Sequence, residues 1–248
     1  MDDADLEIGE EREVAPGVVV QRRSFFKLLA AAFAVLPAHR LLAEEVASST
    51  LTFAGFLAVA VPVAKELVSD TSLAGQDRYL LTLASAAVRL SDVPAPEMRD
   101  SGQGETAGTF IGFNPGGEPF TVLHWKMNPR TAIRLHAHTY GNVVTLGLEG
   151  DAVVENYEVA GEKQFASETA FDVRRTRRQW LSRGGVNLVS LERDYIHGIR
   201  AGSNGARGLD ITTRIRSKEP TPYLVFRDKA DASREIRRAH WSFDAPKK

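Results

Sequence analysis

Residues 134–150 read RLHAHTYGNVVTLGLEG, and this stretch decides the fold. Its second half is a short apolar run that ends in the turn residues Glu149-Gly-Asp151, which is typical of a β-strand. His136 and His138 stand at positions i and i+2, so they point to the same face of a strand. The sequence therefore predicts two imidazoles side by side, as a metal chelate requires.

Period-two patterns extend on both sides of this stretch. Candidate strands separated by turn residues lie at 109–113, 119–127, 132–137, 142–149, 152–159, 186–191, 195–200, 207–215 and 222–227. Many short strands at this spacing predict a mainly β fold, an antiparallel sandwich or barrel. His197 lies in one of these strands, about sixty residues after the histidine pair. Three imidazoles from two strands would form an open site for one metal ion.

A different periodicity precedes the predicted barrel. Between about residues 50 and 92 the apolar residues recur near every 3.6 positions, with turn and capping residues at Ser69–Gly75. This pattern predicts a helical hairpin. The apolar run 51–64 also raises the alternative of a membrane segment. Lys65 and Glu66 cut that run short, so we expect a helix that packs against the core.

The first 43 residues carry a distinct charge pattern. Residues 1–20 hold seven acidic residues and one arginine, and the next stretch is basic and leads into the apolar run Leu28–Leu36. Gln21–Lys27, read as QRRSFFK, resembles the core of a twin-arginine export signal, with cleavage expected after Ala43. The alternative is the basic start of an ordinary amphipathic helix. We expect export to the periplasm by the twin-arginine machinery, a route that carries folded proteins.

The amino-acid composition excludes several classes of protein and of functional site. Hydrophobic residues make up 43% and charged residues 25% of 248 positions, which is ordinary for a globular protein. The absence of cysteine excludes thiolate zinc sites, iron–sulfur clusters and cysteine nucleophiles. A net charge of −1 gives no general attraction to nucleic acid. The expected organisation is a tail and signal at 1–43, the hairpin at 44–100, the barrel at 101–228, and a tail with a short helix at 229–248.

The histidine motifs carry a family resemblance. His136-x-His138, followed after eleven residues by Gly150 and later by His197, resembles the two motifs of the cupin superfamily over about residues 105–227. The resemblance implies a cupin-like antiparallel barrel, the double-stranded β-helix. Many metal-binding cupins place a glutamate four or five residues after the second histidine, where this chain has Asn142 and Val143.

Without that glutamate, the ligand set is similar to that of the thiol dioxygenases, namely cysteine dioxygenase, cysteamine dioxygenase and the plant cysteine oxidases. The stretch Gly208–Ile211 also resembles the cysteamine dioxygenase branch. The Ser-His-Tyr triad of cysteine dioxygenases is replaced by Asp210, Thr212 and Arg214, and Thr109–Trp125 lacks their carboxylate-binding arginine. Free cysteine is therefore not the expected substrate. A different thiol, or no thiol, stays open.

Several further side chains are candidates for the site. Tyr140 would either reach the metal pocket or cap the barrel mouth, and Asp210 would orient a ligand histidine. His124 would line the pocket or be an ordinary core histidine. The Arg174–Arg178 cluster is interpreted as a solvated face.

These features favour an exported non-haem Fe(II) dioxygenase, with His136, His138 and His197 as the metal ligands. A small-molecule substrate and O2 are the expected partners, with no membrane span in the mature protein. Two alternatives are a metal-dependent cupin with non-oxidative chemistry, an isomerase or lyase, and a non-enzymatic small-molecule binder. Mn, Zn or Ni are the alternative metals. Metal content and O2 uptake distinguish the three.

Overall fold

The computed structural model describes residues 50–101, 106–114, 120–165, 169–216, 221–227 and 235–243. The elements are α3 (Phe53–Ser69), α4 (Leu73–Ala87), β1 (Arg99–Asp100), β2 (Thr109–Asn114), β3 (Phe120–Met127), β4 (Ala132–Ala137), β5 (Gly141–Val159), β6 (Phe171–Leu181), β7 (Val186–Val189), β8 (Ile196–Arg214), β9 (Tyr223–Phe226) and β10 (Ile236–Ser242). The expected export segment, 1–43, lies outside the described residues.

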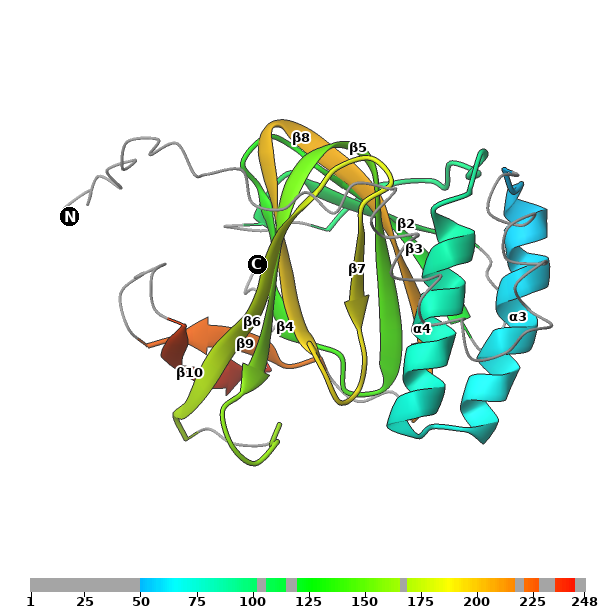
Figure 1. Cartoon of the computed structure of the whole chain (residues 1–248). Coiled ribbons are helices and arrows are strands. Elements are labelled where there is room, and N and C mark those ends of the chain that lie inside the picture. The colour runs from blue at the N-terminus through cyan, green and yellow to red at the C-terminus, as the bar shows by residue number, and fades with distance from the viewer. Residues whose placement is uncertain are drawn as a thin grey trace.

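The strands form a single antiparallel sheet that closes on itself (Figure 1). Its order is β1-β2-β3-β8-β4-β9-β10-β6-β5-β7, and an additional pairing of β8 with β5 joins distant parts of that order. The fold is therefore mainly β, an antiparallel barrel preceded by two helices. The fold class predicted from the change of periodicity is confirmed.

Strands β5 and β8 are each twice as long as expected. The sequence predicts turns at 149–151 and 202–205, but β5 and β8 run through both segments. The pairing passes from Gly150–Ala206 to Ala152–Ala201, so residues 202–205 bulge out of the register with β5. Gly150 and Gly205 have φ values of 66° and 76°, which let the two strands bend without separating. A Cβ atom at Gly150 would lie 2.1 Å from the carbonyl oxygen of Gly205. The two predicted turns are wrong because the glycines bend the strands and do not end them.

The prediction of a short helix near the C-terminal end is also wrong. Its described part, Ile236–Ser242, is strand β10, which pairs with β6 on one side and β9 on the other. Ala239 and Trp241 are buried at positions i and i+2, as a strand between two neighbours requires. The edges of β6 and β9 carry backbone N–H and C=O groups that need partners. A strand at 236–242 pairs with them, whereas a helix there would leave them unpaired.

Strand β6 contains the Arg174–Arg178 cluster, for which the sequence predicts a solvated face. Phe171, Val173 and Leu181 are buried, while the arginines at 174, 175, 177 and 178 are at least partly exposed. These arginines form ion pairs with carboxylates of β5 and of the loop before β8. The cluster is thus the outer face of a barrel strand, and its ion pairs link neighbouring segments.

The predicted helical hairpin is present, and α4 lies between α3 and the barrel (Figure 1). Ser72 caps α4 by accepting a hydrogen bond from the Gly75 N–H, and Thr52 caps α3. Phe56 and Leu83 are fully buried in a cluster that continues into the outer surface of the sheet at Val144. No described helix is long and apolar enough to cross a membrane.

Candidate metal centre

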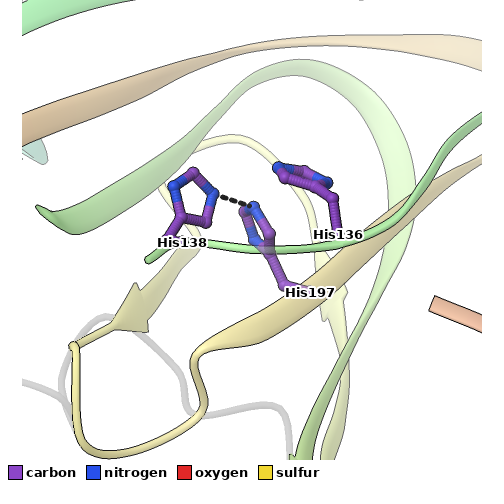
Figure 2. A group of neighbouring side chains, drawn as sticks. All are labelled: His136, His138 and His197. Atoms are coloured by element: carbon purple, nitrogen blue, oxygen red, sulfur yellow. Dashed lines mark hydrogen bonds between the residues drawn. The ribbon is translucent and has the colours of Figure 1, made fainter. Parts of the chain in front are cut away.

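The three predicted metal ligands meet at one point of the barrel (Figure 2). His136 lies on β4 directly opposite His197 on β8, and His138 follows the end of β4. One nitrogen from each ring lies within 4.8 Å of the nitrogens of the other two. Nε2 of His138 and Nε2 of His197 are 3.0 Å apart. Strand pairing therefore produces the convergence that the i, i+2 spacing predicts.

The spacing of two of the three rings suits a transition metal. Two nitrogens bound about 2.1 Å from one ion and at right angles are separated by about 3.0 Å, which is the spacing between His138 and His197. Nδ1 of His136 donates a hydrogen bond to the carbonyl oxygen of Arg134 at 2.9 Å. This bond fixes the tautomer that leaves Nε2 of His136 free to bind an ion.

Burial sets the protonation of the ligands. It lowers the pKa of His136, and it lowers the pKa of both His138 and His197 well below the usual value of 6.5. His138 and His197 are buried, whereas His136 is partly exposed. Neutral imidazoles are the form that binds a metal, so an ion entering near neutral pH displaces no proton from them.

Two tyrosines flank the histidines. The ring of Tyr140 lies 6.4 Å from the ring of His138, and the ring of Tyr223 lies 6.4 Å from that of His136. The guanidinium of Arg134 stacks over the Tyr223 ring at 4.8 Å. Tyr140 thus lies near the site, as one of its two predicted readings requires. Tyr223 is not among the candidates from the sequence, although it lies within the predicted strand 222–227.

Asp210, predicted to orient a ligand histidine, makes no hydrogen bond through Oδ1 to the described residues. It is buried on β8 opposite Thr145 of β5, and the Thr145 hydroxyl and the Trp125 indole lie beside its carboxylate. Among the described residues, neither Oδ1 of Asp210 nor Nδ1 of His197 has a hydrogen-bond partner, so these two atoms are not joined. The carbonyl oxygen of Arg134 provides the hydrogen bond that orients a ligand ring.

Replacing Asp210 with asparagine is expected to stabilise the fold near neutral pH. Burial raises the pKa of Asp210 from 3.8 to about 6, and the nearby Thr145 hydroxyl and Trp125 indole oppose the rise. A carboxyl whose pKa is raised by folding makes the folded state less stable as pH increases through that range. The free energy of unfolding of Asp210→Asn should exceed that of the parent by on the order of 2 kcal/mol near pH 7.5, and by little near pH 4.

Urea denaturation at these two pH values measures the difference. Asp172→Asn is the control, because Asp172 is a half-exposed partner of Arg238 and its removal should give no such gain. A parent protein more stable than Asp210→Asn near neutral pH would contradict the expectation.

Neither of the other two described histidines is part of the group. His124 is buried on β3, where burial and the nearby Arg207 lower its pKa to about 4, and its Nε2 has no partner among the described residues. Its neighbour across the pairing is Leu209, whose side chain belongs to the cluster under the helices. His124 therefore matches its second reading, a core histidine. His240 lies on β10, and His39 lies outside the described residues.

Among known proteins, similarity to this chain is found with solved structures and not with family models or curated sequences. No family model and no curated protein matches the chain. KdgF from Halomonas sp. is similar at 14% identity and a TM-score of 0.35, over 49% of this chain and 88% of that one. The Cnp3 cupin domain of Schizosaccharomyces pombe is similar at 13% identity and a TM-score of 0.35, over 50% of this chain and 72% of that one.

An oxalate decarboxylase from Bacillus subtilis is similar at 17% identity and a TM-score of 0.36, over 48% of this chain and 27% of that one. These identities and TM-scores are low. The assignment of a function therefore rests on the residues of this chain.

Proposed function

We propose that the protein is an oxygenase in which His136, His138 and His197 hold iron(II), and that it oxidises a small thiol to a sulfinate. The observation that supports this proposal most is the ligand set. Three imidazole nitrogens lie within 4.8 Å of one another, and no carboxylate of the described residues joins the group. Three neutral ligands on one side of an ion leave positions for substrate and O2.

The proposed reaction is balanced without a further reductant. The thiol R–SH and O2 give R–SO2H, so both oxygen atoms end on sulfur and the four electrons that reduce O2 come from that sulfur. When bound, the iron supplies adjacent open positions at which a thiolate and O2 are held together.

The chain's own residues prepare this site. The Arg134 carbonyl fixes the ring of His136, and burial keeps the imidazoles neutral. Burial also raises the pKa of Tyr140, so its phenol stays protonated and can donate a hydrogen bond to a substrate atom near His138. Strands β2 and β3 contain no arginine. For this reason we propose a thiol other than free cysteine.

Anaerobic loading with iron(II), followed by exposure to O2 and thiols, tests the proposal. Cysteamine, a peptide that begins with cysteine, and free cysteine form the panel. We expect O2 uptake with at least one of the first two, and a product that has gained two oxygen atoms. Zinc-loaded protein is the matched control, because zinc has no redox chemistry. Iron-loaded protein that consumes no O2 with any thiol would refute the thiol oxygenase and favour a non-oxidative function.

We further propose that the protein reaches the periplasm by the twin-arginine route. The support is the QRRSFFK stretch, Gln21–Lys27, directly before the short apolar run. A chain without cysteine needs no oxidising compartment to fold, which suits a route that accepts folded proteins. The ion would then be bound before export.

A further inference from the structure

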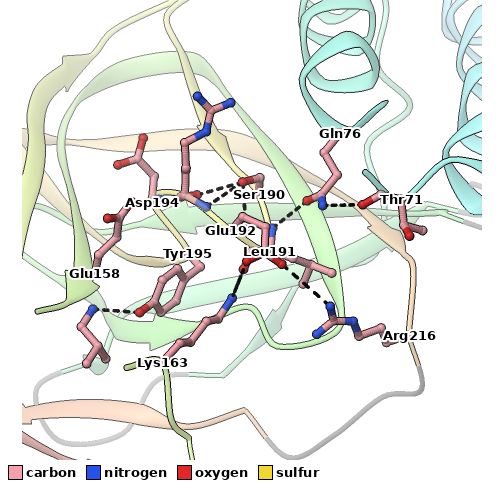
Figure 3. Close-up of polar contacts among 12 residues, drawn as sticks. Thr71, Gln76, Glu158, Lys163, Ser190, Leu191, Glu192, Asp194, Tyr195 and Arg216 are labelled. Atoms are coloured by element: carbon pink, nitrogen blue, oxygen red, sulfur yellow. Dashed lines mark hydrogen bonds and ion pairs between the residues drawn. The ribbon is translucent and has the colours of Figure 1, made fainter. Parts of the chain in front are cut away.

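The loop Ser190–Tyr195 contacts Gln76 of the helical hairpin (Figure 3) and leads directly into β8, the strand that carries His197. The backbone carbonyl of Tyr195 accepts a hydrogen bond from the backbone N–H of His138 at 2.9 Å. His197 follows Tyr195 by two residues and is the second residue of β8. The position of this loop therefore sets the backbone of both His138 and His197.

The loop depends on outside contacts for its conformation. Asp194 has a φ of 56°, in the left-handed region that non-glycine residues rarely adopt. A carboxylate oxygen of Glu158 accepts a hydrogen bond from the Asp194 N–H at 2.8 Å, and the Asn156 side chain donates to the Asp194 carbonyl at 3.1 Å. Lys163 donates a hydrogen bond to the carbonyl of Leu191. These contacts all come from the barrel side.

The helical hairpin holds the loop from the other side. Gln76 of α4 is buried, with 2% of its surface exposed. Its Oε1 accepts a hydrogen bond from the Leu191 N–H at 3.1 Å and shares this donor with Oδ1 of Asn142 on β5, also at 3.1 Å. Its Nε2 donates to the carbonyl of Thr71 at 2.9 Å. The adjacent Asp77 forms an ion pair with Arg193. A buried amide that uses both its donor and its acceptor is costly to displace, so α4 and the loop move together.

We propose that the helical hairpin positions the metal centre, and that Gln76 is the positioning residue. By holding Leu191, Gln76 fixes the loop whose far end carries the Tyr195 carbonyl and His197. Gln76 touches neither the histidines nor a bound ion. The inference rests on the proposed function only in that the three histidines are taken to bind a metal.

Amide hydrogen exchange on the parent protein tests this link without any substitution. Zinc alone serves as the probe and is compared with metal-free protein. Coupling between two sites is reciprocal, so an ion bound by His138 and His197 should slow exchange in the loop and in the first turn of α4. We expect slower exchange at Leu191, Asp194 and Gln76. Protection confined to the strands that carry the histidines would overturn the proposal.

Two variants of α4 separate positioning from general stability. Gln76→Leu removes one of the two acceptors of the Leu191 N–H and leaves Oδ1 of Asn142 in place. We expect zinc binding weaker by up to about fivefold, the effect of one net hydrogen bond. The cobalt(II) absorption spectrum of this variant should also change, because it reports ligand geometry. Tyr79→Phe is the matched control, since the buried Tyr79 hydroxyl hydrogen-bonds Thr213 of β8 and not the loop. It should lower stability and leave zinc affinity unchanged.

Equal loss of zinc affinity in both variants would show that α4 acts only through stability. If Gln76→Leu does not fold, the exchange experiment on the parent protein decides. If the parent binds no metal, the proposed function fails. The positioning role is then read from metal-free protein, where Gln76→Leu should accelerate exchange at Ser190–His197 and Tyr79→Phe should not. No acceleration in that comparison would refute it.

Discussion

Replacement of His197 by alanine is expected to remove the metal from the protein while the barrel stays folded. Two nitrogens would remain, and the chain has no cysteine and no carboxylate in the described group that could take the third place. Loss of an outer hydrogen-bond partner already weakens metal binding about 10- to 100-fold, so loss of a ligand should exceed about 100-fold. Metal content after dialysis measures the effect, and circular dichroism confirms the fold. O2 uptake should be lost in parallel.

His124→Ala is the matched control for this experiment. His124 is also a buried histidine within a strand, but it lies outside the group of three. Its replacement should leave one metal ion per chain, whereas His136→Ala and His138→Ala should behave like His197→Ala. A His197→Ala protein that keeps its full metal content would end the three-histidine hypothesis, and the oxygenase proposal with it.

Joint substitution of Arg22 and Arg23 by lysine is expected to keep the folded protein in the cytoplasm. Lysine preserves the charge but not the planar, multi-donor guanidinium that paired arginines present to a receptor. Cell fractionation measures the distribution, and metal analysis of the retained protein tests whether the ion is bound before export.

Arg40→Lys provides the control for the export experiment, because it makes the same chemical change in the same basic segment outside the arginine pair. That variant should be exported like the parent. Equal periplasmic yields of the parent and the double variant would rule out the twin-arginine proposal.

Elements whose signal is local were predictable from the sequence. The helical hairpin follows from its 3.6-residue period and the cap at Ser72, and β2 to β4 follow from their alternation. β10 was not predictable in this way. Ile236–Ser242 contains Arg237, Arg238 and His240 among its apolar residues, and this pattern is compatible with a helix or with a strand. Its conformation is decided by β6 and β9, the strands on either side.

The same distinction applies to the site. The three ligands were predictable because histidine is scarce in this chain and two of the three share one strand face. The carbonyl of Arg134 was not, because every residue has a carbonyl and only the folded geometry selects one. Gln76 carried no signal either. It is 115 residues from its partner Leu191, and a single glutamine in a helix resembles any exposed one.

The long pairing of β5 with β8 has a consequence for the time at which the protein can fold. Phe120 pairs with Thr213, Gly141 pairs with Arg214, and β10 joins β6 to β9 near the end of the chain. Such a high contact order makes folding slow, because distant segments must meet before the sheet gains stability. The barrel cannot close until the ribosome has synthesised Ser242, and the three metal ligands cannot meet until the start of β8, which carries His197, has been made. A signal near residue 22 emerges long before that moment. Under the proposed route, recognition of this signal must therefore wait until synthesis ends. A factor that delays this recognition would favour export of metal-loaded protein.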